Sequence, residues 1–131
     1  MNTPERINVL IVDDNSIDAF IAEEVLKHDF KTLFVTNGYA ALEAIEKEKF
    51  DIVLMDINLN DHTMDGIATM RKIKYQQKHK RTKIIAVTSS SDAKEWFMKQ
   101  GFDGHHLKPL SRKTILEEIR VTLNRTCVLL L

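Results

Sequence analysis

Polar side chains stand directly after short apolar runs at four points of the chain. Asp13 and Asp14 follow the first such run, Asp56 ends the third, Thr88 follows the fourth, and Lys108 follows a weaker fifth one. Continuous apolar runs of this length are typical of strands buried on both faces of a parallel sheet. The carboxyl ends of such strands share one rim, and ligands of open α/β sheets bind there. We therefore expect these five side chains to gather in one site.

Three carboxylates in one site predict a cation. Asp13, Asp14 and Asp56 would repel one another unless one took up a proton or a cation lay among them. Mg²⁺ accepts one or two carboxylates and keeps waters for substrate oxygens, so it suits this set. The backbone carbonyl of Asn58 could supply a further metal oxygen.

The remaining two side chains favour phosphoryl chemistry. Lys108 adds a fixed positive charge and Thr88 a hydroxyl donor, which together with Mg²⁺ would neutralise the oxygens of a phosphoryl group. A carboxylate can act as the nucleophile and form an aspartyl-phosphate. Asp56 is the best candidate for that role, because it ends a central apolar strand.

The elements that must position these residues alternate along the chain. We predict strands over 9–12, 33–35, 52–55, 84–87 and 104–107. Helices are expected from a cap at Ser16, around 40–45, over 64–77, over 92–100 with Gly101 as a stop signal, and from a cap at Ser111 to about Leu123. Five βα units of this kind predict an α/β fold with a parallel sheet covered by helices on both faces.

Composition restricts the class of protein. The 131 residues, 44% of them hydrophobic, suffice for a single domain, expected over 1–131 with a core at about 8–124 and a tail at 125–131. Nineteen Lys and Arg balance nineteen Asp and Glu, so no net charge favours nucleic acid or an anionic membrane. The single cysteine, Cys127, excludes a disulfide framework. No signal peptide or membrane helix is apparent, and we expect a cytoplasmic protein.

Five segments together resemble a known family. They are VLIVDDN (9–15), DIVLMDINL (51–59), MDGI (64–67), IIAVTS (84–89) and GFDGHHLKP (101–109). Their order and spacing, over about 8–123, resemble the response-regulator receiver domains of two-component signalling, the CheY-like superfamily. The resemblance implies a flavodoxin-like, doubly wound five-stranded sheet of order 2-1-3-4-5.

The resemblance also implies roles for single residues. Asp56 would be phosphorylated by a histidine kinase or a histidine phosphotransfer protein, and would lose the phosphoryl group slowly by itself, so the chain is expected to be a phosphoacceptor rather than an enzyme. Mg²⁺ would lie on Asp14, Asp56 and the Asn58 carbonyl, with Asp13 acting mainly through water. Lys108 would pair with the phosphoryl group and precede a cis bond to Pro109.

A switch is implied as well. Thr88 would be the switch hydroxyl, while Asn58 and Ser90 would tune hydrolysis. Phosphorylation would change the surface formed by 92–100, 104–107 and 112–123, which an unknown downstream partner reads. His105 stands where the family usually has a switch aromatic, and His106 where it usually has a buried apolar residue. A pH-sensitive docking face is one hypothesis that follows from His105.

Other interpretations of the sequence stay open. A degenerate receiver could bind partners without phosphorylation. His105 favours this interpretation, and the intact set of three acids, Thr88 and Lys108 opposes it. A phosphatase with Asp56 as nucleophile would be expected to carry an acid where this chain has Asn58. Zinc binding by His105 and His106 is disfavoured, since adjacent strand residues point to opposite faces. The basic run 71–83 is interpreted as a solvated helix end rather than a docking patch. We expect a monomer or weak dimer without a DNA-binding output domain.

Overall fold

Strands and helices alternate regularly in the computed structural model, which describes residues 6–59, 63–79, 81–89 and 93–129. The strands are β1 (Asn8–Val12), β2 (Lys31–Val35), β3 (Ile52–Asp56), β4 (Lys83–Thr88) and β5 (Gly104–Leu107). The helices are α1 (Ser16–Leu26), α2 (Gly38–Lys47), α3 (Gly66–Tyr75), α4 (Lys94–Gln100) and α5 (Arg112–Leu129), with a short 3₁₀ turn η1 (Gln77–His79). All strand pairs are parallel, in the order β2-β1-β3-β4-β5. The predicted α/β fold and the sheet order implied by the resemblance are both confirmed.

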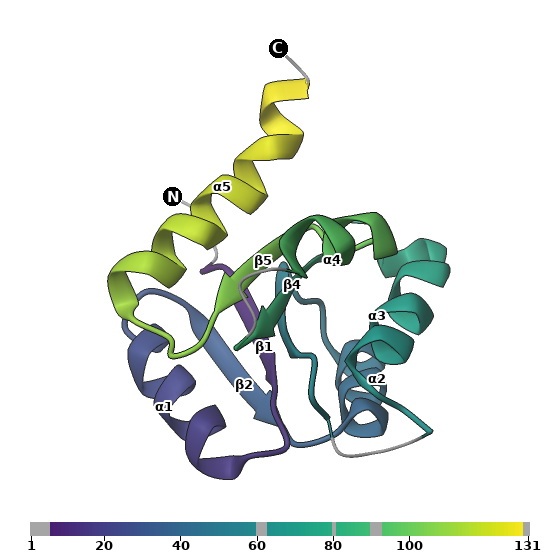
Figure 1. Ribbon diagram of the computed structural model, residues 1–131, viewed down its shortest axis with the longest axis horizontal. Helices are drawn as coiled ribbons and strands as arrows, with labels where there is room; N and C mark the ends of the chain where they lie inside the picture. The colour runs from purple at the N-terminus through teal and green to yellow at the C-terminus, as the bar shows by residue number, and fades with distance from the viewer. Residues whose placement is uncertain (1–5, 60–62, 80, 90–92, 130–131) are drawn as a thin grey trace, which may run out of the picture.

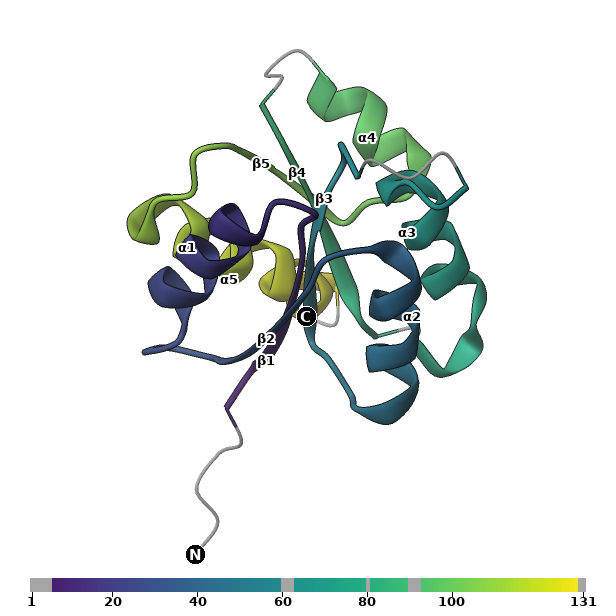
Figure 2. The ribbon, with the colours of Figure 1, turned by 90° about the horizontal axis from the view of Figure 1, so that it is seen from below.

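Helices lie on both faces of the sheet (Figures 1 and 2), and each face has its own apolar core. Successive side chains of a strand face opposite ways, so Val9 and Ile11 of β1 pack on one side while Leu10 and Val12 pack on the other. Helices α1 and α5 cover the first side, and α2, α3 and α4 cover the second. Every residue of β1 and β3 is buried, which explains why both strands are continuously apolar up to their polar ends.

The N-cap of helix α1 lies one residue before the predicted one. Asn15 is the N-cap, and its Oδ1 accepts hydrogen bonds from the backbone N–H groups of Ile17 (3.0 Å) and Asp18 (3.1 Å). Ser16 is therefore the first helical residue, and the prediction of Ser16 as the cap is wrong. Asparagine and serine cap helices about equally well, so residue type alone does not distinguish two neighbours.

Two helix ends also differ from the predicted ones. Helix α3 begins after Asp65, whose Oδ1 accepts from the N–H of Ala68 at 2.8 Å, and it ends at Tyr75 before the η1 turn. Helix α5 continues to Leu129, past the predicted end near Leu123 and through much of the expected tail, because no glycine or proline interrupts it. Gly101 does end α4, with the left-handed φ of 119° that favours glycine. No helix in the described ranges is both long and apolar enough to cross a membrane.

A close approach at Gly66 brings the start of α3 against the end of β3. A Cβ at this position would lie 2.5 Å from the backbone oxygen of Asp56, closer than real side chains come. Glycine in the MDGI segment is therefore required by packing against the strand that carries Asp56.

Candidate functional site

Three carboxylates meet where β1 and β3 end. Asp13 follows β1, Asp14 is the next residue, and Asp56 is the last residue of β3. Each offers an oxygen, and these oxygens all lie within 4.8 Å of one another. Asp13 and Asp56 are buried, whereas Asp14 is half-buried. The sequence prediction that these acids gather at the rim is confirmed by the geometry.

Local hydrogen bonds orient the two buried acids. The N–H of Asn15 donates to Asp13 Oδ1 at 2.9 Å, and the N–H of Asn58 donates to Asp56 Oδ1 at 3.1 Å. Both bonds fold the chain back over the carboxylate as it leaves its strand, which limits the orientation of each carboxylate. Asn58 thus contacts Asp56 through its backbone N–H, while the metal role expected for its carbonyl remains a prediction.

Burial makes this arrangement electrostatically unfavourable without a cation. Desolvation is the main cause that raises the pKa of Asp13 from 3.8 to about 6, and the charge of Asp56 raises it further. The N–H of Asn15 and the charge of Lys108 oppose the shift without cancelling it. The three carboxylates therefore form a group of oxygens with excess negative charge, which a hard divalent cation would relieve.

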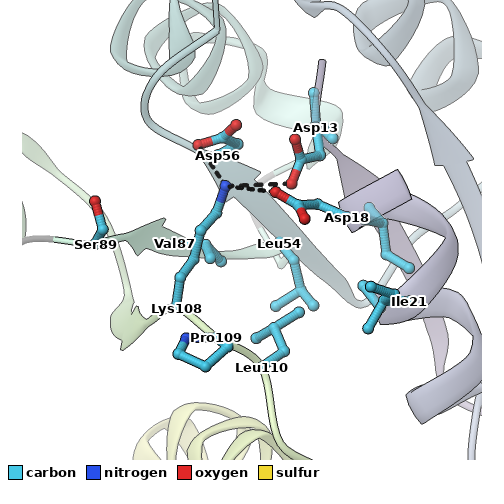
Figure 3. A pocket seen from close by; sticks show the side chains of 13 residues that line it. Asp13, Asp18, Ile21, Leu54, Asp56, Val87, Ser89, Lys108, Pro109 and Leu110 are labelled. Carbon is cyan, nitrogen blue, oxygen red and sulfur yellow. Dashed lines mark ion pairs between the residues drawn. The ribbon is translucent and has the colours of Figure 1, made fainter. Parts of the chain in front are cut away.

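Lys108 places its ammonium among the acids (Figure 3). Its Nζ lies 3.4 Å from Asp13 Oδ2 and 3.4 Å from Asp56 Oδ1. Burial acts to lower the pKa of Lys108, but the charges of Asp56 and Asp13 outweigh it and raise the pKa, so the side chain stays protonated. The expected cis bond between Lys108 and Pro109 is present.

A third acid, which the sequence analysis did not single out, also faces Lys108. Asp18 Oδ2 lies 3.7 Å from the Nζ, and Figure 3 shows its carboxylate turned toward the ammonium from helix α1. Because α1 starts just after Asp14, a residue in its first turn lies beside the same rim. That position in the first turn is the signal that could have identified Asp18.

The end of β4 is connected to the lysine through the backbone. The N–H of Lys108 donates to the carbonyl of Thr88 at 2.8 Å, which extends the β4–β5 ladder by one bond. Thr88 is buried at the end of β4. Its neighbour Ser89, rather than Thr88 itself, lines the cavity of about 390 Å³ that contains Asp13, Asp56 and Lys108. Ser90 lies outside the described residues.

The two histidines of β5 face opposite sides of the sheet, as predicted. The His105 ring stacks on Phe97 of α4, with centroids 5.7 Å apart. His106 Nε2 lies 3.4 Å from Thr114 Oγ1 of α5. Both histidines are buried, and desolvation lowers the pKa of His106, although the charge of Glu118 partly opposes this. The two rings thus lie against different helices, α4 and α5, on opposite faces of the sheet.

Comparison with known proteins establishes the family. The family model for the response regulator receiver domain matches residues 9–120. The chain belongs to this family. Every residue of the site described above lies within the matched range, so the rim with its acids and lysine is part of a receiver domain of two-component systems.

Relatives of known name support this assignment. The sensor histidine kinase GacS of Pseudomonas protegens is 32% identical over 85% of the chain, and the transcriptional regulatory protein ZraR of Klebsiella oxytoca is 30% identical over 92%. The chain spans only 12% and 26% of their respective lengths. Among solved structures, the chemotaxis response regulator CheY4 of Vibrio cholerae superposes with a TM-score of 0.77 at 25% identity, covering 90% of this chain and 99% of that one.

Proposed function

We propose that Asp56 accepts a phosphoryl group from a phosphohistidine, carried by a histidine kinase or a histidine phosphotransfer protein. The observation that carries the proposal is the position of Lys108, whose Nζ lies 3.4 Å from a carboxylate oxygen of Asp56, at a rim where Asp13 and Asp14 add two further acids. A nucleophile, a fixed cation and a place for a divalent cation are then within one cavity.

The transfer balances as a displacement at phosphorus. An Asp56 carboxylate oxygen forms a bond to phosphorus while the P–N bond to the donor imidazole breaks. The electron pair of the P–N bond remains on the imidazole nitrogen. Lys108 is placed to neutralise charge on the transferred oxygens, because Asp56 already holds its ammonium nearby. Mg²⁺ would be held by Asp14, Asp56 and the Asn58 carbonyl, with Asp13 acting mainly through water, and it would supply the remaining positive charge.

The same arrangement supports a switch. A phosphoryl group adds charge and acceptor oxygens at the rim, and Lys108 is bonded through its backbone to Thr88. We expect a movement of Lys108 or Thr88 to pass to α4, β5 and α5. Trp96 of α4 and Leu107 of β5 are half exposed, so they are available to a downstream protein. In this proposal the chain acts as a single phosphoacceptor unit rather than as an enzyme with turnover.

Incubation with acetyl phosphate and Mg²⁺ tests the proposal. Intact-mass measurement is expected to find one added phosphoryl group in the wild type and none in Asp56→Asn. The matched control is Asp51→Asn, just before the opposite end of the same strand, where the carboxylate accepts a hydrogen bond from the N–H of Asn8; it is expected to label like the wild type. Failure of the wild type to label, with Mg²⁺ present, would favour the degenerate binding module instead.

A further inference from the structure

The ammonium of Lys108 is shared among three acids rather than bound to one. Its distances to Asp13, Asp56 and Asp18 are 3.4, 3.4 and 3.7 Å. A direct charge-assisted hydrogen bond is about 2.7–2.9 Å long, which is shorter than any of these three distances. The inner two carboxylates are nearly buried, with side chains 9% and 4% exposed, while that of Asp18 is 46% exposed. Lys108 therefore lies between an inner pair of acids and an outer one at the rim.

The outer acid is held in place by the start of its helix. The N–H of Asp18 donates to the capping side chain of Asn15 at 3.1 Å, and the N–H of Asn15 in turn donates to Asp13. The backbone that carries Asp18 is thus fixed relative to the inner acids. Beneath the ammonium, the cavity is lined by apolar side chains such as Leu54, Val87 and Leu110. Moving the charged ammonium into that apolar part would cost desolvation free energy, so the ammonium stays beside the acids.

We propose that Asp18 is a positioning residue that competes with the incoming phosphoryl group for Lys108. This inference rests on the proposed phosphorylation of Asp56. Asp18 holds the ammonium toward the outer rim and adds a negative charge at the mouth of the cavity. A phosphoryl donor must draw Lys108 away from Asp18 and must approach against its charge. The site therefore disfavours small, freely diffusing anionic phosphodonors.

The charge count around the lysine gives the direction of the effect. Among the residues that the structure describes, three carboxylates lie within 3.7 Å of this ammonium, and neutralising Asp18 leaves the two inner ones. The repulsion of an anionic donor falls, and Lys108 loses its outer partner. Because the pair of Asp18 and Lys108 is partly exposed, we expect a change in rate of about two- to fivefold, the range of an exposed ion pair.

The rate of phosphorylation by acetyl phosphate, at saturating Mg²⁺ and low salt, tests this inference. In that reaction an Asp56 oxygen bonds to phosphorus, the P–O bond to the acetyl group breaks, and acetate leaves with the electron pair. Asp18→Asn is expected to label about two- to fivefold faster than the wild type. Asp18→Glu keeps the charge and is expected to return the rate toward that of the wild type.

Salt and a matched control distinguish electrostatics from a structural effect. The advantage of Asp18→Asn should shrink at about 1 M salt, where the Debye length is about 3 Å. Glu24→Gln removes the same charge from the same helix, but Glu24 pairs with Lys27 instead, at 2.8 Å. It is expected to label at the wild-type rate. An advantage that is equal in Glu24→Gln, or unchanged by salt, would overturn the role given to Asp18.

The failure of this inference differs from the failure of the proposed function. If neither the wild type nor any variant incorporates a phosphoryl group, phosphorylation of Asp56 is wrong. If the wild type labels at Asp56 and Asp18→Asn labels no faster, only the competition by Asp18 is wrong.

Discussion

At the rim beside α1, acids surround one lysine, whereas on the edge strand β5 two histidines lie among packed side chains. Burial acts on both regions in the same way, since it disfavours the charged form of any group. It raises the pKa of Asp13 to about 6 and lowers the pKa of His106. The acids would have to be ionised to hold a cation, whereas a neutral His106 still packs against its neighbours.

The difference separates a region whose groups suit chemistry from one whose groups add to stability. The rim keeps like charges close together, which lowers stability and would be relieved by a divalent cation. The β5 region uses its polar rings in a stack with Phe97 and in a contact with Thr114. We expect substitutions near β5 to change stability more than phosphorylation, and substitutions at the rim to change phosphorylation more than they reduce stability.

The largest effect on stability is expected at Phe97. Its side chain is 5% exposed and contacts both Phe102 and His105. Phe97→Ala should lower the free energy of unfolding by about 3–5 kcal/mol, because a large ring leaves a cavity. Chemical denaturation measures this, and Phe97→Leu provides a milder variant should the alanine variant not fold.

The adjacent Trp96 is the control for that prediction. It lies on the same helix but is 50% exposed, so Trp96→Ala should change stability far less. Folded Phe97→Leu should still label with acetyl phosphate and Mg²⁺ at a rate close to the wild type. If Phe97→Leu were folded but labelled many times more slowly than the wild type, the contrast between the two regions would be wrong.

An effect of opposite sign is expected at Asp13. In EDTA at pH 7.5, Asp13→Asn should raise the free energy of unfolding by about 1–3 kcal/mol. The reason is that a folded-state pKa of about 6, above the ordinary 3.8, makes the ionised carboxylate destabilising as the pH rises through this interval. Denaturation with and without Mg²⁺ checks this, and Mg²⁺ should stabilise the wild type more than the variant.

A smaller effect is expected at the cap that links Asp13 to Asp18. Asn15→Ala removes the side chain that accepts from Ile17 and Asp18, and should lower the free energy of unfolding by about 1 kcal/mol. Ser16→Ala should have little effect, since Ser16 is the first helical residue. Thermal or chemical unfolding of the two variants compares them directly, and a larger loss for Ser16→Ala would contradict the observed cap.

The smallest effect is a pH dependence at His106. Because burial lowers its folded-state pKa, the unfolded chain binds the proton more readily, and stability is lost as the pH falls below 6.5. The charge of Glu118 raises the pKa of His106, and that of His105 lowers it. His106→Phe should reduce this loss between pH 7.5 and 5.5. Asp13 titrates in a similar pH range, and its effect on stability has the opposite sign. The quantity to measure is therefore the difference in free energy of unfolding between His106→Phe and the wild type at each pH.

Much of the site could be predicted because it depends on strand ends. Apolar runs that stop at Asp13, Asp56 and Lys108 define strands, and parallel packing then brings their carboxyl ends to one rim. The same reasoning predicted that His105 and His106 face opposite ways, which follows from the two-residue period of a strand.

Other features depended on contacts that no local pattern determines. Whether Asn15 or Ser16 caps α1, and where α3 begins and α5 ends, depends on hydrogen bonds and packing at helix ends, where several residues are nearly equivalent. That Ser89 rather than Thr88 lines the cavity is likewise a feature that only the tertiary structure decides.

The order of residue types along the chain thus determined the class of fold, the acids of the rim and the lysine opposite them, because each follows from the periodicity of buried strands. Only the tertiary structure decided that Asp18 joins this group and that Lys108 is shared among three carboxylates. The physical reason is that distances between side chains on different elements depend on how helix α1 and the segment after β5 pack together. That packing is a property of the whole core rather than of any one segment.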